Sequence, residues 1–225
     1  MINNTHNICL LKGTLVFLIL AYSLNFSYSQ LNIKAGYIGM DGQFEATNAL
    51  FQDYNTNNSL DKTFKNLGYL QGIDIGLRYR INNLGLEAGW YNMQSSKIEA
   101  LGDGVNENWR ISNSQFYLGL ENYFGHLGFG ASIGYNNIKY RRKIESSRDR
   151  STKQSDNFLS TKFCLIITAS SGKTGISIKP FYQPQWNSHN ITDFNHTLNG
   201  TKPEGLSDYL KGFGISIALY NGPQS

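Results

Sequence analysis

Residues 68–93 read GYLQGIDIGLRYRINNLGLEAGWYNM, and hydrophobic residues alternate with small or charged ones through most of this segment. Successive side chains of a β-strand point to opposite faces, so Ile73 and Ile75 share one face while Asp74 lies on the other. The alternation resumes after an Asn-Asn pair, which predicts two strands joined by a tight turn. The predicted apolar face comprises Ile73, Ile75, Leu77, Tyr79, Ile81, Leu84, Leu86, Ala88 and Trp90.

The two faces of this predicted hairpin differ in an informative way. The non-apolar face combines glycines with ionised residues such as Asp74, Arg78 and Glu87, whereas the apolar face is large and partly aromatic. A strand with lipid outside and a narrow polar lumen inside has this pattern. The competing fold is a soluble, lipocalin-like barrel, in which Ile73 and Leu77 would point inward.

Composition agrees with an exported, β-rich chain. The 225 residues include 23 Gly, 14 Tyr and 13 Phe but only 4 Pro, and 16% are charged. The length suits one large or two small domains. Cys9 lies in the N-terminal segment, so removal of that segment leaves Cys164 alone and excludes an intramolecular disulfide. A disulfide-free exported domain of this size is typical of a bacterial envelope.

The N-terminal segment predicts a signal peptide over residues 1–29. Lys12 precedes an apolar run over residues 13–24, and small residues near Ser29 fit a cleavage site. The run is too short to span a bilayer as a helix, although an uncleaved anchor or a buried helix is the alternative. Cleavage after Ser29 would leave residues 30–225 as one β-barrel domain with a formal charge of +3, since 19 basic and 16 acidic residues remain.

Taken in order, the chain predicts about eight strands whose connections alternate between long and short. The tight turns lie near residues 82–83, 125–126 and 170–173, and they place both ends of the barrel domain at one rim. Polar loops are predicted at residues 41–66, 99–108, 139–156 and 187–205, the first with a short helical turn near residues 46–52. The fold class is therefore all-β: an eight-stranded antiparallel up-and-down transmembrane β-barrel with short periplasmic turns and long extracellular loops.

This arrangement resembles the OmpA/OmpX-like family of small outer-membrane β-barrels, in the form common among Bacteroidota. The resemblance covers residues 30–225 and implies the outer membrane of a Gram-negative bacterium, insertion by the barrel-assembly machinery and a monomer. One departure is Pro180, because a closed barrel has no edge strand where a missing N–H is harmless. A bulge or an early strand end is expected there. The predicted interface aromatics are Trp90, Trp109, Phe124, Tyr135, Tyr182, Trp186 and Tyr220.

The predicted lumen carries a network of charges, which must pair or hydrate because an isolated buried charge is unfavourable. The network comprises Lys34, Asp74, Arg78, Arg80, Glu87, Glu121, Lys162 and Lys179. An eight-stranded interior is only about wide enough for side chains, so a plug of salt bridges is one interpretation. A small gated pore is the other.

The third predicted loop, residues 139–156, concentrates positive charge. Its basic residues are Arg141, Arg142, Lys143, Arg148, Arg150 and Lys153, against three acidic residues. Such a cluster at an outer rim could contact lipopolysaccharide or another polyanion by charge attraction, and a solvated loop is the alternative. Nucleic acid is not expected as a partner, because no aromatic-studded basic groove is present and the chain is exported.

The fourth predicted loop brings a nucleophile, a base and a carboxylate close together in the sequence. Ser188, His189, Asp193 and His196 lie there after Trp186, and some eight-stranded barrels modify lipid A. The local order does not reproduce the His-x-Ser-Asn order of the deacylases. We therefore expect no enzyme, no cofactor and no metal, and an envelope-structural or surface-interaction role. The alternatives are a narrow porin-like channel for small solutes and a lipid A-modifying enzyme.

Overall fold

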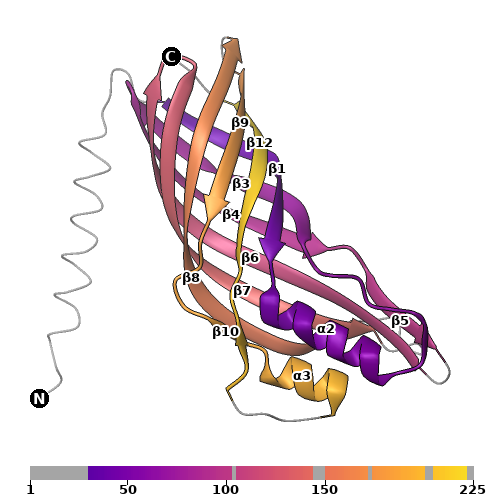
Figure 1. Ribbon diagram of the computed structural model, residues 1–225. Helices are drawn as coiled ribbons and strands as arrows, with labels where there is room; N and C mark the ends of the chain where they lie inside the picture. Colours follow the sequence, from indigo (N-terminus) through magenta and orange to yellow (C-terminus); the bar gives the residue numbers. More distant parts are fainter. Residues whose placement is uncertain (1–29, 103–104, 144–149, 172–173, 201–204, 222–225) are drawn as a thin grey trace, which may run out of the picture.

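Eight antiparallel strands close into a ring in the computed structural model, which describes residues 30–102, 105–143, 150–171, 174–200 and 205–221 (Figure 1). Each strand pairs with its neighbours along the chain, and the first and last strands of the ring pair with each other through 11 residue pairs. The ring strands are β1 (Gln30–Gln43), β3 (Tyr69–Ile81), β4 (Leu84–Ser95), β6 (Val105–Phe124), β7 (Leu127–Lys143), β8 (Arg150–Ser171), β9 (Thr174–Gln183) and β12 (Lys211–Asn221).

Two of the tight turns have the backbone that their sequences favour. Asn82, between β3 and β4, has a φ of 51°, and Gly125, between β6 and β7, has a φ of 67°. Asn and Gly adopt this left-handed conformation at a small energetic cost, and its twist matches that of the flanking strands. The predicted hairpin over residues 68–93 and the predicted all-β antiparallel fold are confirmed.

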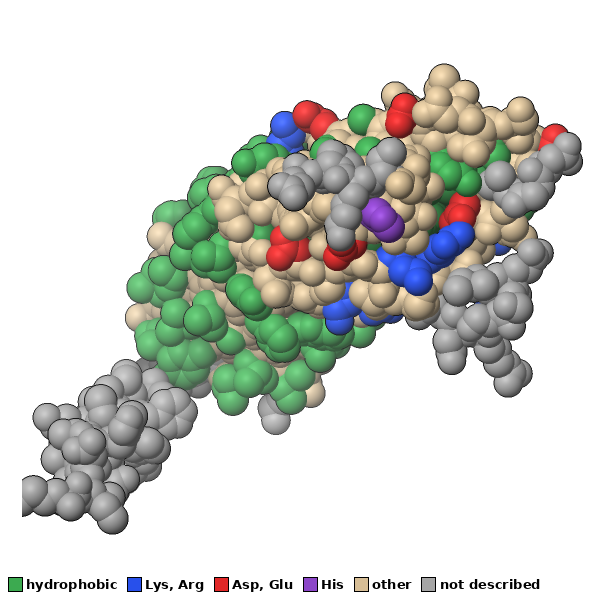
Figure 2. Space-filling view, turned by 90° about the horizontal axis from the view of Figure 1, so that it is seen from below, with side chains coloured by type: hydrophobic (Ala, Val, Ile, Leu, Met, Phe, Trp, Pro, Cys, Tyr) green, Lys and Arg blue, Asp and Glu red, His purple; other side chains and the backbone are tan. Residues whose placement is uncertain are grey.

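The outer wall of the ring is apolar on every strand. The side chains of Ile33, Ile73, Leu86, Leu118, Phe129, Phe163, Ile176 and Phe213, one per strand, are between 41% and 71% exposed. Figure 2 shows hydrophobic side chains gathered on one part of the molecule and charged ones toward its other end. Because Ile73, Ile75 and Leu77 point outward, the soluble lipocalin-like alternative, with the opposite facing, is wrong.

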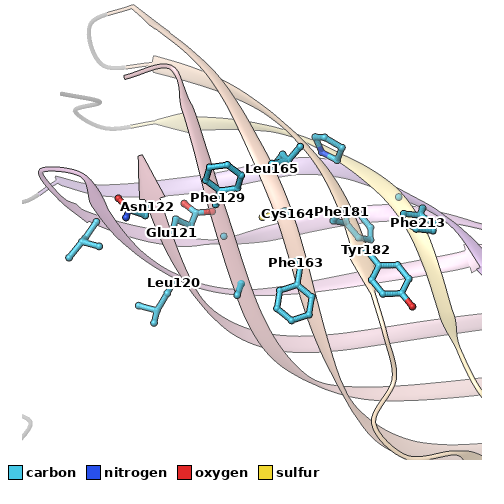
Figure 3. A pocket seen from close by; sticks show the side chains of 15 residues that line it. Leu120, Glu121, Asn122, Phe129, Phe163, Cys164, Leu165, Phe181, Tyr182 and Phe213 are labelled. Carbon is cyan, nitrogen blue, oxygen red and sulfur yellow. The ribbon is translucent and has the colours of Figure 1, made fainter. Parts of the chain in front are cut away.

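Pro180 interrupts one hydrogen-bonded ladder of the ring. Strand β9 continues past it to Gln183 and keeps its register with β12, so the expected bulge or early strand end is absent. The ladder with β8 passes from the Cys164–Phe181 pair directly to the Ile167–Ile178 pair. Proline has no N–H to donate, which explains a gap on one side only. An apolar hollow of about 770 Å³ lies on the wall beside it (Figure 3).

Three ring strands continue well beyond the apolar wall. Within the predicted loops at 99–108 and 139–156, residues 105–108 begin β6, residues 139–143 end β7 and residues 150–156 begin β8. Two short strands pair alongside: β5 (Ile98–Gly102) and β2 (Leu60–Lys62). We call β2, β5 and the outer ends of β6, β7 and β8 the external sheet. The prediction was wrong because it depended on hydrophobic alternation, which ends where the strands leave the apolar zone, whereas backbone pairing continues.

Two helices cover the same end of the ring (Figure 1). Helix α2 (Glu45–Asn57) is longer than the predicted helical turn, and α3 (Thr192–Asn199) lies where only a loop was predicted. A two-stranded ribbon of β10 (His189–Asn190) and β11 (Ser207–Asp208) flanks α3. We call α2, α3, β10 and β11 the cap.

No helix in the described part of the chain is both long and apolar enough to cross a membrane.

The cap encloses an apolar core, so the apolar face changes side along the strands. Near the tight turns large apolar residues point outward, whereas under the helices inward residues such as Met40 and Trp109 pack beneath Phe51 and Phe194. Two predicted interface aromatics are therefore wrong: Trp109 and Tyr220 are buried. In β6 and β12 these two residues occupy the positions that point inward. The direction of a side chain depends on its position in the strand and not on its residue type. Phe124, Tyr135, Tyr182 and Trp186 are exposed, and Trp90 is half-buried.

Candidate functional site

The interior of the ring nearest the tight turns holds a network of ionised side chains. Lys34 on β1 donates hydrogen bonds to Asp74 Oδ2 at 2.5 Å, Glu87 Oε1 at 2.8 Å and the Tyr117 hydroxyl at 2.8 Å. These partners come from β3, β4 and β6, and all four side chains are buried. One ammonium group thus joins four strands, because its three N–H bonds all find acceptors.

Glu87 links this lysine to a second one across the interior. Lys179 on β9 donates to Glu87 Oε2 at 2.6 Å and also to Glu121. The Tyr220 hydroxyl donates to Glu87 Oε2 at 2.9 Å. Two ammonium groups therefore share one buried carboxylate, and the pairing compensates part of the desolvation of all three charges.

The two arginines of the predicted network differ in their surroundings. Arg78 is 1% exposed, donates to Asn32 Oδ1 from Nη2 at 2.6 Å, and stacks over the Tyr220 ring at 3.7 Å. Arg80 is half-buried near the tight turn, where its Nε donates to the Asn82 carbonyl oxygen at 3.0 Å. Seven of the eight predicted lumen charges are therefore buried inside the ring, and Arg80 lies at its rim.

Lys162 is buried and makes no salt bridge within the described ranges. Its Nζ lies 4.4 Å from the centroid of the Tyr117 ring, and its cross-strand neighbour is Ser132. Both residues line an internal void of about 20 Å³, which is large enough for roughly one water molecule. The Ser132 hydroxyl has no protein hydrogen-bond partner. A single water there would hydrate both groups.

A second inward layer consists of amides and hydroxyls, and the sequence reasoning missed it. Gln115 donates to Ser160 Oγ at 2.7 Å, Asn136 donates to the same oxygen at 2.9 Å, and Gln183 donates to the Tyr91 hydroxyl at 2.9 Å. Their alternation with the outward residues was the available signal. This layer separates the charged network from the apolar core under the cap, so the inward side chains form a continuous filling.

The cap is fastened to the ring by a chain of hydrogen bonds. Asp208 accepts from the backbone N–H groups of Ala46 at 3.2 Å and Thr47 at 2.8 Å, at the N-terminus of α2. Thr47 Oγ1 lies 3.0 Å from the Tyr140 hydroxyl, which lies 3.0 Å from His189 Nε2. Burial lowers the pKa of His189 to about 4. The imidazole is therefore neutral at physiological pH, as its position between aromatic rings requires.

The nucleophile, base and carboxylate of the predicted fourth loop are not brought together. His189 faces Tyr140 in the buried cap, whereas Asp193 and His196 are exposed on α3. Within the described ranges, no group of three metal-ligating side chains could hold a metal ion. The arrangement of His189 supports a structural role in the cap.

The basic residues predicted in the third loop are divided between two faces. Arg142 points inward and donates to Glu107, with Nε 2.8 Å from Oε2. Arg141 and Lys143 alternate with it and point outward on β7, while Lys153 lies at a register shift in β8. The backbone of Arg150 lies in β8, and Arg148 is outside the described residues. The sequence reasoning missed Lys62, Lys97, Arg110 and Lys139. Arg110 is the cross-strand partner of Arg141, Lys139 lies two residues before Arg141 on β7, and Lys62 and Lys97 pair with Glu99 of β5.

A closed ring with an apolar wall and a filled polar interior is the geometry of a small membrane β-barrel. The chain has the fold of Ail. This attachment invasion locus protein of Yersinia pestis, solved in complex with the heparin analogue sucrose octasulfate, is 12% identical to the chain, with a TM-score of 0.52 over 87% of this chain and 99% of that one. Neisserial surface protein A is 10% identical, with a TM-score of 0.49 over 87% and 99%. No protein-family model matches the chain, and no curated protein sequence matches it.

The likeness to Ail confirms the predicted outer-membrane type of β-barrel fold. At this level of identity it extends to the fold alone. The narrower expectation of a Bacteroidota-type protein stays a prediction, and so does the signal peptide at residues 1–29, which lies outside the described residues.

Proposed function

We propose that the chain is a non-enzymatic β-barrel of the outer membrane of a Gram-negative bacterium, with a structural or surface-interaction role. The observation that carries the proposal is the apolar wall. On β7 the outward residues from Leu127 to Tyr135 are nonpolar or aromatic, and this nine-residue stretch rises about 20–25 Å when the strand is tilted by about 40°. An outer-membrane barrel needs an apolar band about 25 Å tall.

The orientation follows from the two rims. The tight turns and both ends of the described ring lie at one rim, which we assign to the periplasm, and the cap and external sheet lie at the other, which we assign to the cell exterior. Export by a cleaved signal peptide at residues 1–29 and insertion by the barrel-assembly machinery belong to this proposal, as does a monomer. The ordered cap and external sheet would then be the surface that meets lipids and partners outside the cell.

A plug, rather than a pore, is the interpretation of the interior that its contacts favour. Lys34, Glu87 and Lys179 bridge opposite strands, and the amide layer and the capped apolar core follow along the axis. The internal void near Lys162 has room for about one water molecule. A narrow porin-like channel would require these contacts to part.

Three measurements on refolded protein, and one on lipid A, test the proposal. Unboiled protein should migrate differently from boiled protein in a detergent gel, because a closed barrel resists detergent, and it should insert into vesicles. Planar-bilayer recordings should show no stable conductance. If the boiled and unboiled samples migrate alike, the protein is not a closed barrel. Steady conductance steps would support the porin-like channel and refute the plug. A mass change in lipid A on expression would instead support the enzyme.

A further inference from the structure

The external sheet gathers basic side chains that are far apart in the sequence onto its outer side. Because side chains alternate along each strand, the outward positions above the apolar wall can be assigned from the register. We call this set the basic face. It consists of Lys62, Arg110, Lys139, Arg141 and Lys143 on the strands, together with Lys97, which precedes β5 and pairs with Glu99. Among the described residues on this side, Glu99 is the acidic one. It accepts salt bridges from both Lys62 and Lys97, which lower the pKa of its carboxyl to about 2.

The centre of the basic face places like charges opposite each other. Arg110 on β6 is the direct cross-strand partner of Arg141 on β7, and Lys139 faces Ser112 one step closer to the apolar wall. Like charges in opposing positions destabilise a sheet. In addition, Arg110 Nε is inaccessible to solvent and has no hydrogen-bond partner among the described residues. An anion between these two side chains would offset their repulsion and could accept from Arg110 Nε.

The basic face lies directly above the apolar wall on the same side of the same strands. Lys139 is four residues beyond Tyr135 on β7. With a rise of about 3.3 Å per residue and a tilt of about 40°, its Cα lies about 10 Å farther from the membrane centre. The head-group layer extends roughly 5–8 Å beyond the hydrocarbon edge, and a lysine stem can reach back over such a distance.

We propose that the basic face binds the phosphate groups of anionic glycolipids in the adjacent membrane leaflet. An acyl chain that lies along Ile133 and Tyr135 would bring its own head group to Lys139, Arg141 and Arg110. Guanidinium groups bind phosphate through paired, charge-assisted hydrogen bonds, so the two arginines supply specificity as well as charge. This inference rests on the proposed membrane location, and it names the lipid class that the outer surface of the protein recognises.

The test uses the full barrel domain in vesicles that contain equal amounts of bisphosphorylated lipid A and dephosphorylated lipid A with the same acyl chains. Native mass spectrometry then measures the ratio of the two lipids that remain bound to the protein. We expect the natural protein to prefer the phosphorylated form by about fivefold or more, and about 500 mM NaCl to weaken that preference.

Three variants separate the basic face from net charge. Arg110→Gln with Arg141→Gln should bring the ratio close to one, while Arg110→Lys with Arg141→Lys should keep a preference because the charge remains. The matched control, Ala49→Glu with Gln52→Glu on the exposed side of α2, changes the net charge by the same amount away from the face and should keep the ratio of the natural protein.

Three outcomes would overturn the inference. The first is a natural protein that inserts and shows the gel shift but has no lipid preference, and the second is a Gln variant that keeps the preference. The third is binding of sucrose octasulfate by the detergent-solubilised protein without any preference among lipids, which would assign the face to a soluble polyanion. Failure of the natural protein to insert would instead refute the proposed membrane barrel, and the gel shift distinguishes that result.

Discussion

Replacement of Glu87 by Gln should strongly destabilise the folded barrel. The carboxylate accepts from Lys34, Lys179 and the Tyr220 hydroxyl, and it is 5% exposed. Glutamine keeps the shape but carries no charge. The substitution therefore leaves two buried ammonium groups to share the remaining carboxylates of Asp74 and Glu121.

The expected magnitude follows from the loss of one partner of a buried ion pair. Removal of one partner typically lowers the free energy of unfolding by about 3–5 kcal/mol when the other charge is left without compensation. Because Lys34 keeps Asp74 and Lys179 keeps Glu121, we expect a loss near the lower end of this range, about 3 kcal/mol. An exposed pair contributes only about 0–1 kcal/mol. Glu45→Gln is thus a matched control, since Glu45 is 78% exposed and pairs with Lys211 at 3.2 Å.

The assay is reversible urea unfolding in lipid vesicles, followed by tryptophan fluorescence and by the gel shift. Glu87→Gln should lower the free energy of unfolding several times more than Glu45→Gln does. If the two substitutions have equal effects below about 1 kcal/mol, the interior network does not hold the barrel together and the reasoning fails. Planar-bilayer recordings provide a second readout. Glu87→Gln should show more conductance than the natural protein, because loss of the Glu87 contacts should loosen the plug.

Three further predictions concern the cap and the membrane boundary. The pKa of His189 is about 4 in the fold and about 6.5 in an unfolded chain, so the cap should lose stability as the pH falls from about 6.5 to about 4, by up to about 1.4 kcal/mol per pH unit. Hydrogen exchange of α2 and α3 should become faster over this pH range. His189→Phe should abolish the pH dependence, whereas His196→Phe should leave it unchanged. Asp208→Ala should lower the stability of α2 by about 1 kcal/mol through its lost N-terminal cap, detected as faster exchange in α2 than in α3. In single-tryptophan variants, brominated acyl chains should quench Trp186, which is 55% exposed, but not the buried Trp109; equal quenching would contradict the assigned boundary.

Much of the ring could be predicted because alternation is a local property of two successive residues. The outward direction of Ile73 and the inward direction of Asp74 follow from it, and Asn82 and Gly125 mark turns by their backbone freedom. The same reasoning failed for Trp109, because an aromatic residue was assigned to the boundary by its type and not by its position along β6.

The outer end of the molecule was predicted poorly for a different reason. Beyond the apolar wall the strands carry polar residues on their outer side, so the hydrophobic pattern that identified them disappears while pairing continues. Helix α2 depends on Asp208, more than 150 residues away in the sequence, for its N-terminal cap. No local window of sequence contains that interaction.

The sequence by itself determined which side chains face outward near the tight turns and which charges enter the interior. Only the tertiary structure decided which charges meet: pairing of β1 with β3, and of β3 with β4, sets the register that brings Lys34 to Asp74 and Glu87, and pairing of β6 with β7 brings Arg110 opposite Arg141. The physical reason is that alternation fixes the direction of a side chain, whereas its neighbours depend on the register between strands that are distant in the chain.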